Sequence, residues 1–225
     1  MTIGKRDFDK EAAAWDEQPG RIKLAGEIAA AIEERVQLSI AMNVLDFGCG
    51  TGLLTLRLAP LVGSITGVDS SKGMIEVLRA KIAGQNAENV SALFMDLDAG
   101  DTLTRSYDMI VSSMTFHHVE KIAPLLEQFQ RCLVPGGHLC IADLDLDQGE
   151  FHKDGKGVFH SGFDRKALGR DLEQAGFLNV MCATAAEVVR PASGGEMRRF
   201  PVFLMSALSQ GRRSRRKSGP SALPS

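Results

Sequence analysis

Runs rich in apolar and β-branched residues alternate along this 225-residue chain with stretches whose apolar residues recur every three or four positions. Strand and amphipathic helix in alternation is the pattern that a parallel sheet with crossover helices requires. We therefore expect an α/β fold. The five clearest strand candidates are Met42–Phe47, Ser64–Asp69, Val90–Met95, Tyr107–Ser113 and His138–Asp143.

Helical spacing follows most of these strands. One helix is predicted over Leu53–Leu61, a second from Ser70 or Ser71 as N-cap, and a third over Ile122–Leu133, with Pro135-Gly136-Gly137 expected to stop it. A last helix near Asp164–Ala175 begins at Asp164, which we expect to cap it.

The remaining patterns complete the architecture. Residues 8–17 and 21–38 predict two helices ahead of the sheet, and two more strands are expected near Leu178–Val189 and Phe200–Ala207. The resulting prediction is a doubly wound, Rossmann-like, seven-stranded, mostly parallel sheet with helices on both faces. We divide the chain into an N-terminal helical cap (1–40), a core domain (41–208) and a disordered basic tail (209–225).

Charge is unevenly distributed along the chain. The net charge is −2, but residues 211–225 hold five basic residues and no acid, so residues 1–210 carry 21 basic and 28 acidic groups. An acidic body makes a nucleic-acid partner unlikely. The tail is expected to be a solvated terminus, with an arm for anionic lipid or RNA as the alternative.

Several features favour a cytoplasmic protein without a membrane span. The longest apolar stretch, Leu53–Val62, is interrupted by Arg57, and the charged residues between Lys5 and Glu11 leave no room for a signal peptide. Four cysteines without a Cys-x-x-Cys pair indicate small buried residues in a reducing compartment.

The most informative motif runs from Val44 to Gly52, Val-Leu-Asp-Phe-Gly-Cys-Gly-Thr-Gly, between a strand and a helix. Its glycines permit a sharp turn and a close approach of the backbone to a ligand. Asp69 ends the next strand 21 residues after Gly48, where a carboxylate can accept both hydroxyls of a ribose. The first half of the chain is therefore expected to bind a nucleoside-containing ligand.

The register of the glycines separates two classes of nucleoside ligand. A dinucleotide site has Gly-x-Gly-x-x-Gly, whose last glycine would fall on Leu53. Asp46 precedes the first glycine by two residues, and its carboxylate would repel a pyrophosphate but pair with an ammonium group.

Five motifs in order resemble those of the class I S-adenosylmethionine (SAM)-dependent methyltransferases, and the N-terminal run Phe8–Asp16 resembles the opening of the quinone-biosynthesis C-methyltransferase branch. The resemblance covers most of residues 8–208. The matching segments are Leu45–Gly52, Gly67–Ser71, Met95–Leu97, Tyr107–Ser113 and Leu133–Gly137.

This resemblance implies SAM as the cofactor and assigns residues to its parts. Asp46 and the loop containing Gly48, Gly50 and Gly52 would hold the methionine portion, and Asp69 the ribose. Ser70, Met74, Asp96 and Leu97 would surround the adenine, and Ser112 or Ser113 would lie under the sulfonium. Phe8, Trp15 and Arg21 are candidates for a lid. Each residue also has a purely structural alternative, such as helix capping for Asp69, helix packing for Met74, core packing for Trp15 and a solvated loop for Asp96, Asp98 and Asp101.

Histidines follow two strands at the edge where the ligand is expected. His117 and His118 come after the fourth strand, and His152 and His160 lie in the glycine-rich segment after the fifth. In this order they are our candidates for a base or a substrate contact, with simple structural roles as the alternative. A metal on His152, Asp154 and His160 is the weaker hypothesis, because the spacing fits no standard zinc pattern, and no metal is expected.

The favoured function is methyl transfer from SAM to a small-molecule acceptor. Ser112–Thr115 stands where methyltransferases of exocyclic base amines or glutamine carry Asn/Asp-Pro-Pro-Tyr, which argues against those substrates. Three alternatives stay open: a nucleic-acid or ribosome-associated methyltransferase that uses the tail, a non-catalytic SAM-binding module, and an NAD-dependent oxidoreductase.

Overall fold

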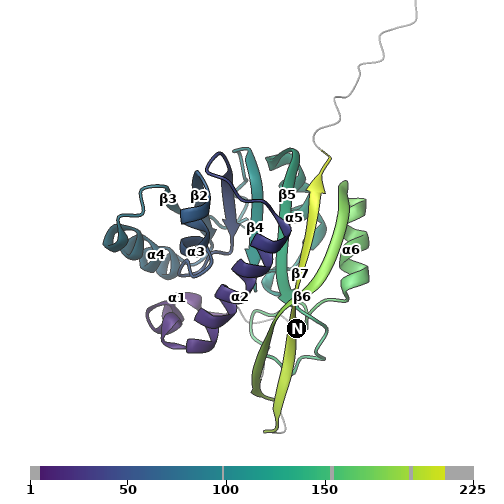
Figure 1. Ribbon diagram of the computed structural model, residues 1–225. Helices are drawn as coiled ribbons and strands as arrows, with labels where there is room; N and C mark the ends of the chain where they lie inside the picture. Colours follow the sequence, from purple (N-terminus) through teal and green to yellow (C-terminus); the bar gives the residue numbers. More distant parts are fainter. Residues whose placement is uncertain (1–5, 98, 153–154, 193–194, 211–225) are drawn as a thin grey trace, which may run out of the picture.

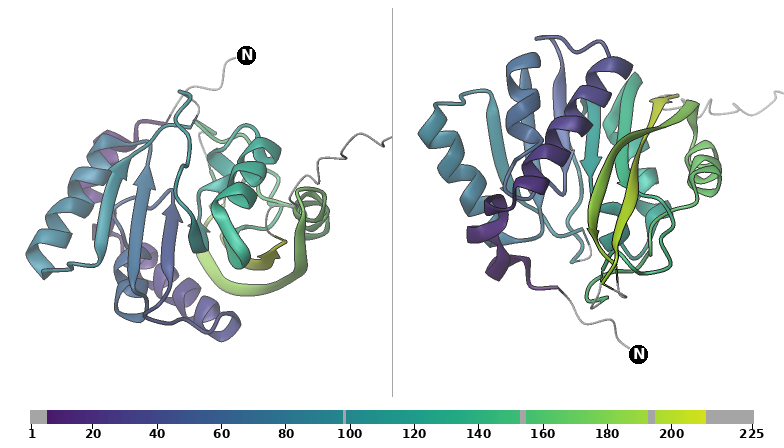
Figure 2. Two further views of the ribbon diagram at one scale, coloured as in Figure 1. Left: turned by 90° about the horizontal axis from the view of Figure 1, so that it is seen from above. Right: turned by 60° about the horizontal axis from the view of Figure 1, so that its bottom comes forward.

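A computed structural model describes residues 6–97, 99–152, 155–192 and 195–210. Its centre is one seven-stranded sheet in the order β3-β2-β1-β4-β5-β7-β6 (Figures 1 and 2). β1 to β5 run parallel, and the β6–β7 hairpin is antiparallel, which confirms the predicted mostly parallel sheet. The strands are β1 (Asn43–Phe47), β2 (Ser64–Asp69), β3 (Val90–Phe94), β4 (Tyr107–Ser113), β5 (Leu133–Leu144), β6 (Phe177–Pro191) and β7 (Met197–Ser209).

Helices connect the strands and cover both faces of the sheet, as predicted. Those of the chain's first half are α1 (Phe8–Glu11), the 3-10 helix η1 (Ala12–Glu17), α2 (Pro19–Arg35), α3 (Thr55–Leu58), η2 (Ala59–Leu61) and α4 (Lys72–Gln85). The second half adds η3 (Phe116–His118), α5 (Ile122–Cys132) and α6 (Arg165–Gln174).

Alternation along each strand divides the core into two layers. Val44 packs with α2 and α3 on one face, whereas its neighbour Leu45 packs with α5 and α6 on the other. The same division separates Met109 from Ile110 in β4. Burial on both faces explains why these strands read as continuous apolar runs.

Three local predictions differ from the structure in physically informative ways. The helix expected over Leu53–Leu61 is divided into the short α3 and η2, with Pro60 inside the second. The helix before Pro135-Gly136-Gly137 ends earlier, at Cys132, because Leu133 already pairs with Tyr107 across the sheet. The last two strands are longer than expected, and their hairpin extends beyond the rest of the sheet (Figure 1).

Both predicted N-caps are confirmed. The hydroxyl of Ser71 accepts the Met74 N–H at the start of α4, and Asp164 Oδ1 accepts the Ala167 N–H at the start of α6 at 2.7 Å.

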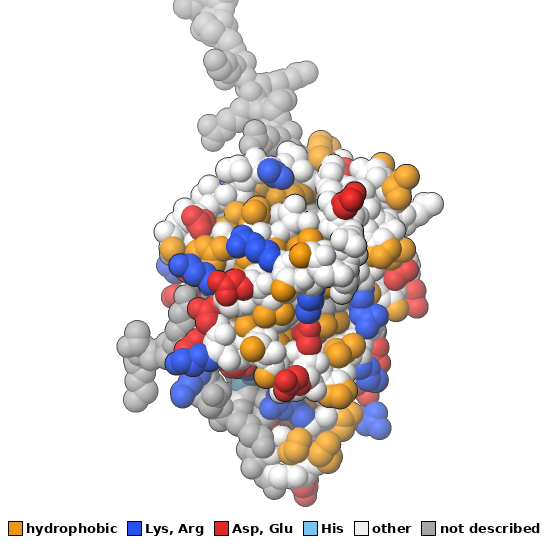
Figure 3. All heavy atoms as spheres, turned by 90° about the vertical axis from the view of Figure 1, so that its left-hand side faces the viewer, with side chains coloured by type: hydrophobic (Ala, Val, Ile, Leu, Met, Phe, Trp, Pro, Cys, Tyr) orange, Lys and Arg blue, Asp and Glu red, His pale blue; other side chains and the backbone are white. Residues whose placement is uncertain are grey.

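Surface charge is mixed on the face formed by α4 and the β3 edge. Basic and acidic side chains are interspersed there rather than gathered by sign (Figure 3). Within the described residues, no helix is long and apolar enough to cross a membrane. The basic run of the tail, residues 211–225, lies outside the described residues.

Candidate functional site

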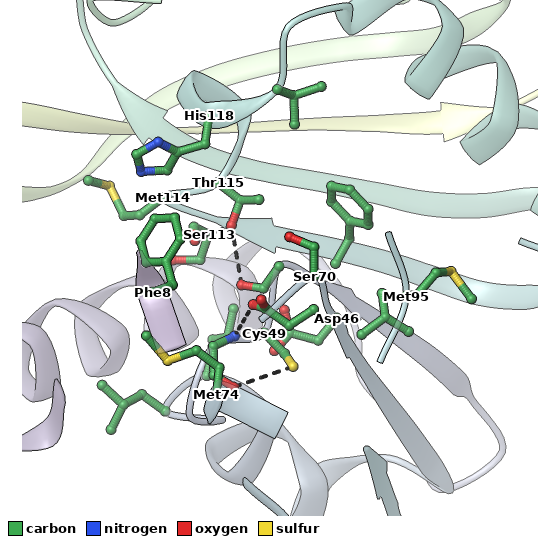
Figure 4. A pocket seen from close by; sticks show the side chains of 18 of the residues that line it. Phe8, Asp46, Cys49, Ser70, Met74, Met95, Ser113, Met114, Thr115 and His118 are labelled. Carbon is green, nitrogen blue, oxygen red and sulfur yellow. Dashed lines mark hydrogen bonds between the residues drawn. The ribbon is translucent and has the colours of Figure 1, made fainter. Parts of the chain in front are cut away.

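A cavity with an empty volume of about 1320 Å³, part of it open to solvent, lies at the carboxyl ends of β1, β2 and β4. The strand order reverses between β1 and β4, and this switch point is where open α/β sheets bind ligands. Figure 4 shows His118, Met114 and Phe8 at one end of the cavity and Met95 at the other. The cavity therefore has two chemically different ends.

Three glycines in the loop after β1 have positive φ, and each has a different structural role. A Cβ on Gly48 would lie 2.2 Å from the Thr115 side chain, so this glycine permits the β1 and β4 loops to touch. Gly50 lines the cavity, where a Cβ would meet only the Met74 sulfur, at 4.0 Å. Gly52 packs against Leu78 and does not line the cavity, and its expected contact with the cofactor stays a prediction.

Asp46 lies at the floor of the cavity and is only 1% exposed. Thr55 Oγ1 donates a hydrogen bond of 2.6 Å to its Oδ2. Burial raises the pKa of Asp46 to about 7, since the Thr55 hydrogen bond only partly offsets the loss of water and the nearby Asp69 charge adds to it. This carboxyl is therefore suited to a cationic partner that replaces the lost hydration.

Asp69 joins the two loops that form the nucleoside end. Its Oδ2 accepts the Gly50 N–H and its Oδ1 accepts the Ser71 N–H, each at 2.8 Å. Burial raises the pKa of Asp69, and these backbone donors act in the opposite direction. Asp69 thus holds the backbone just before α4, whose N-cap is Ser71 and not Asp69, and also lines the cavity with Ser70.

The far wall is formed by Met74 of α4 and by Met95, Asp96 and Leu97 after β3. Asp96 donates its backbone N–H to Asp101 Oδ2 at 2.9 Å, so these two acids form a closed turn. Asp98 lies outside the described residues.

At the end of β4, the two serines proposed to lie under the sulfonium point to different surroundings. Ser113 lines the cavity, whereas the buried Ser112 hydroxyl donates to the Phe47 carbonyl between neighbouring strands at 2.9 Å. Of these two alternatives, Ser113 is the one that faces the cavity, and Ser112 joins two strands. Met114 follows with a φ of +55°, a conformation that non-glycine residues seldom adopt and that occurs often at functional sites.

Among the four candidate histidines, His118 lines the cavity. Its ring meets Phe8 edge to face at a centroid distance of 5.1 Å, and its Nδ1 lies 2.6 Å from the Gly157 carbonyl oxygen. Burial, with the neighbouring His117 ring, lowers the pKa of His118 to about 4. The imidazole is therefore neutral at physiological pH.

The other three candidate histidines do not line the cavity, and their expected contact with substrate stays a prediction. His117 is turned into the protein, where its Nδ1 lies 2.7 Å from Asp143 Oδ1. His160 Nε2 contacts the Val119 carbonyl oxygen at 2.9 Å. The His152 ring is tilted by 34° against that of His117 and meets that of His118 edge to face, and burial lowers the pKa of His152 to about 3. Asp154, part of the weaker metal hypothesis, lies outside the described residues.

The N-terminal cap covers part of the cavity, with Phe8 at the His118 end (Figure 4). Phe8, Trp15 and Arg21 all line the cavity, as the lid prediction requires. The Arg21 guanidinium lies 3.5 Å from the Trp15 ring centroid, and Thr51 Oγ1 donates to Asp16 Oδ1 at 2.6 Å. Asp16 also forms an ion pair with Lys81.

Sequence reasoning missed part of the lining, mostly apolar residues next to the motifs. Met114 and Thr115 directly follow a strand end, and that position was a signal that they could line the cavity. For Val119 and Leu125 the sequence holds no such signal, because only the folded chain brings them to the cavity. The lining residues without an expected role as contacts are Leu24, Ala25, Phe47, Leu53, Leu54, Val68, Met114, Thr115, Val119 and Leu125.

Comparison with known proteins agrees with this geometry. Residues 44–137 match the model of a family described as a methyltransferase domain. The O-methyltransferase rstn1 of Aspergillus nomiae is 33% identical over 180 residues, covering 72% of this chain and 77% of that protein. An uncharacterized methyltransferase of Schizosaccharomyces pombe is 33% identical over 135 residues, covering 54% of this chain. That match includes 48% of the yeast protein, so the chain spans about half the length of this relative.

The fold is shared with solved structures. Phosphoethanolamine N-methyltransferase 2 of Haemonchus contortus, determined in complex with SAM, superposes with a TM-score of 0.67 at 16% identity, covering 93% of this chain and 61% of that one. The ordered motifs, the glycine loop with its two acids, and the coverage of rstn1 lead to one assignment. The chain belongs to the class I SAM-dependent methyltransferases.

Proposed function

We propose that this protein transfers the methyl group of SAM to a small-molecule acceptor that enters the cavity at its His118 end. The observation that carries the proposal is the division of one cavity between two chemistries. Carboxylates and an open glycine backbone form one end, and apolar side chains around a single imidazole form the other.

The first end suits each part of SAM. A Cβ at Gly50 would occupy the cavity, so the glycine leaves room for a ligand against the backbone. Asp46 would pair with the ammonium group of the methionine portion, and the lone pairs that Asp69 keeps beyond its two N–H donors would accept the ribose hydroxyls. Met74, Met95 and Leu97 offer apolar faces for the adenine.

When bound, SAM supplies the reactive methyl group on a sulfonium, so the protein's own task is alignment and exclusion of water. The cap serves the second task, because Phe8 and Trp15 cover the cavity and Asp16 fastens them to Thr51. Ser113 and Met114, at the end of the rigid β4, would fix where the acceptor lies.

The second end favours a small acceptor with an apolar or aromatic body. Met114 and Phe8 lie beside His118 there (Figure 4). Because the Gly157 carbonyl can only accept a hydrogen bond, His118 Nδ1 carries the proton and Nε2 is left as an acceptor. A hydroxyl, thiol or amine on the acceptor would be held by such a nitrogen. The names of rstn1 and of the nematode enzyme, an O- and an N-methyltransferase, are consistent with acceptors of this kind.

The test measures binding and transfer separately. SAM and its demethylated product should bind the purified chain with micromolar or tighter affinity in calorimetry. Radiolabelled methyl from SAM should then appear in at least one member of a panel of small phenols, thiols and amines. NADH should not compete, and transfer to RNA instead of the panel would replace the small-molecule assignment. SAM binding without transfer to any acceptor would favour a binding module.

A further inference from the structure

Three of the chain's five histidines meet behind the His118 end of the cavity. His117 and His118 come from η3 and His152 from the segment after β5, and one ring nitrogen of each lies within 4.8 Å of those of the others. Their ring centroids are 4.1 Å (His117–His118), 4.8 Å (His117–His152) and 5.6 Å (His118–His152) apart. We propose that these three imidazoles bind a divalent first-row transition metal ion, for which Zn²⁺ is the reference. This site goes beyond methyl transfer and does not depend on it.

The hydrogen bond between His117 Nδ1 and Asp143 leaves His117 Nε2 as the nitrogen that can bind a metal ion. Asp143 is fully buried, and its Oδ1 lies 2.7 Å from His117 Nδ1 while its Oδ2 accepts the His117 backbone N–H at 3.2 Å. A carboxylate accepts hydrogen bonds, so Nδ1 carries a proton and Nε2 is the nitrogen left for a metal ion. A carboxylate behind a histidine in this way orients metal-ligating imidazoles and raises their basicity.

His118 is oriented in the same sense by a different acceptor. Its Nδ1 lies 2.6 Å from the Gly157 carbonyl oxygen, which again assigns the proton to Nδ1 and the lone pair to Nε2. The Phe159 N–H donates to the His117 carbonyl at 2.9 Å and holds the segment that carries Gly157 against η3. His160, in contrast, uses Nε2 for the Val119 carbonyl and is not part of the cluster.

His152 completes the cluster with an unsatisfied atom. Its Nε2 is buried and has no hydrogen-bond partner among the residues that the structure describes. Buried polar atoms in native proteins are nearly always paired, so this nitrogen needs an explanation. A metal ion would supply the missing partner and would also relieve the mutual approach of imidazole lone pairs.

Charge around the cluster permits a cation. Arg6 and Arg190 lie close enough to lower the pKa of His152, but Arg6 is neutralised by a bidentate ion pair with Glu11 at 2.8 and 2.6 Å. The carboxylate of Asp143 lies behind His117 and balances part of a metal's charge. Arg190 extends over the Phe151 ring, 4.7 Å from its centroid.

The ligand set selects the class of metal. Neutral imidazoles suit zinc, cobalt, nickel and copper, whereas magnesium and calcium require oxygen ligands. Three protein ligands leave a fourth coordination position for water or substrate, as in catalytic zinc sites. Because the ion would take the His118 Nε2 lone pair beside the cavity, an acceptor entering the metal-loaded protein would meet the open coordination position instead of the imidazole nitrogen.

The experiment titrates tag-free, chelator-treated protein with Co²⁺, followed by visible absorption, and then displaces Co²⁺ with Zn²⁺. We expect one equivalent to bind with the d–d bands of a four- or five-coordinate nitrogen site. His152→Ala should weaken binding at least 10-fold, whereas His160→Asn and His138→Asn, which change histidines outside the cluster, should bind as the wild type does.

Two results with the wild-type protein would overturn the proposal. One is no cobalt uptake below about 100 µM, and the other is a thiolate-to-cobalt charge-transfer band, which would assign the metal to a cysteine such as the exposed Cys182. If His152→Ala proves unfolded by circular dichroism, His118→Gln takes its place. His118 lies beside the open cavity, so its substitution disturbs less packing. Unchanged affinity in the folded variant also rejects the site.

Discussion

Asp69 Oδ2 accepts the Gly50 backbone N–H at 2.8 Å, so the carboxylate that ends β2 also holds the glycine loop that follows β1. Its other oxygen accepts the Ser71 N–H at the start of α4. One buried side chain therefore fixes the loop, the helix start and the ribose position that we propose.

The first prediction concerns this residue. Asp69→Ala removes the acceptor for the ribose hydroxyls and should weaken SAM binding by about 1–3 kcal/mol, or roughly 5- to 150-fold. It also leaves two backbone N–H groups without their acceptor, so the melting temperature should fall. Calorimetry with SAM and thermal unfolding measure the two effects. Unchanged affinity in a folded variant would exclude Asp69 from the cofactor site.

The second prediction contrasts two glycines of the same loop. Gly52→Ala places a Cβ 2.3 Å from a Leu78 methyl group at a φ of +83°, in the fully buried core. Overpacking and backbone strain should destabilise the protein by about 2–4 kcal/mol. Gly50→Ala has a φ of +53° but points its Cβ into the cavity, so it should lose at least 10-fold in SAM affinity with a smaller change in melting temperature. The reverse ranking of the two variants would contradict the assignment.

The third prediction concerns closure of the cap. Asp16 accepts the Thr51 hydroxyl at 2.6 Å and pairs with Lys81, which ties η1 to the glycine loop and to α4. Hydrogen bonds to charged groups contribute about 1.5–3 kcal/mol, and partial exposure of this pair places it at the lower end. Asp16→Ala should therefore accelerate release of the demethylated cofactor roughly 10-fold in stopped-flow measurements.

A matched control is available for the cap variant. Glu127 forms an exposed helical ion pair with Arg131 at 3.7 Å, far from the cap in the sequence. Glu127→Ala removes the same kind of charge but should leave the release rate unchanged, because exposed pairs contribute little. Equal acceleration in both variants would show that net charge, and not the contacts of Asp16 with Thr51 and Lys81, controls release of the cofactor.

Local patterns predicted the framework of the site well. The strand ends at Phe47 and Asp69, the cap at Ser71 and the glycine loop all follow from residues close in sequence, whose backbone preferences are strong. The last two strands were located within three residues at each end, whereas their antiparallel pairing was not predicted.

Long-range contacts explain what could not be predicted. Whether His117 or His118 faces the cavity depends on Asp143, 26 residues away, which draws His117 inward. The different duties of Gly50 and Gly52 depend on where α4 places Leu78. The spacing of residues in the sequence predicts neither the His117–Asp143 contact nor the Gly52–Leu78 contact. The two histidines, and likewise the two glycines, therefore cannot be distinguished from the sequence alone.

The last prediction follows from the raised pKa of Asp46. With a pKa of about 7 in the fold against 3.8 for the free side chain, the native cofactor-free protein binds more protons than the unfolded chain between these values. The contribution of Asp46 to stability is therefore fully present below pH 4 and is lost as the pH rises through about 7. Thermal unfolding of the cofactor-free protein should show this decline relative to Asp46→Asn.

Binding of SAM should have the opposite pH dependence. The ammonium group of SAM prefers the ionised carboxylate, so Asp46 must release its proton when the cofactor binds below pH 7. Affinity should rise by up to about 10-fold per pH unit between pH 5.5 and 7 and then level off, while the ligand's α-amino group stays protonated up to about pH 7.7. In Asp46→Asn, whose side chain can still accept the Thr55 hydroxyl, affinity should be lower and flat over this range. A flat profile in the wild type would show that Asp46 does not meet the ammonium group.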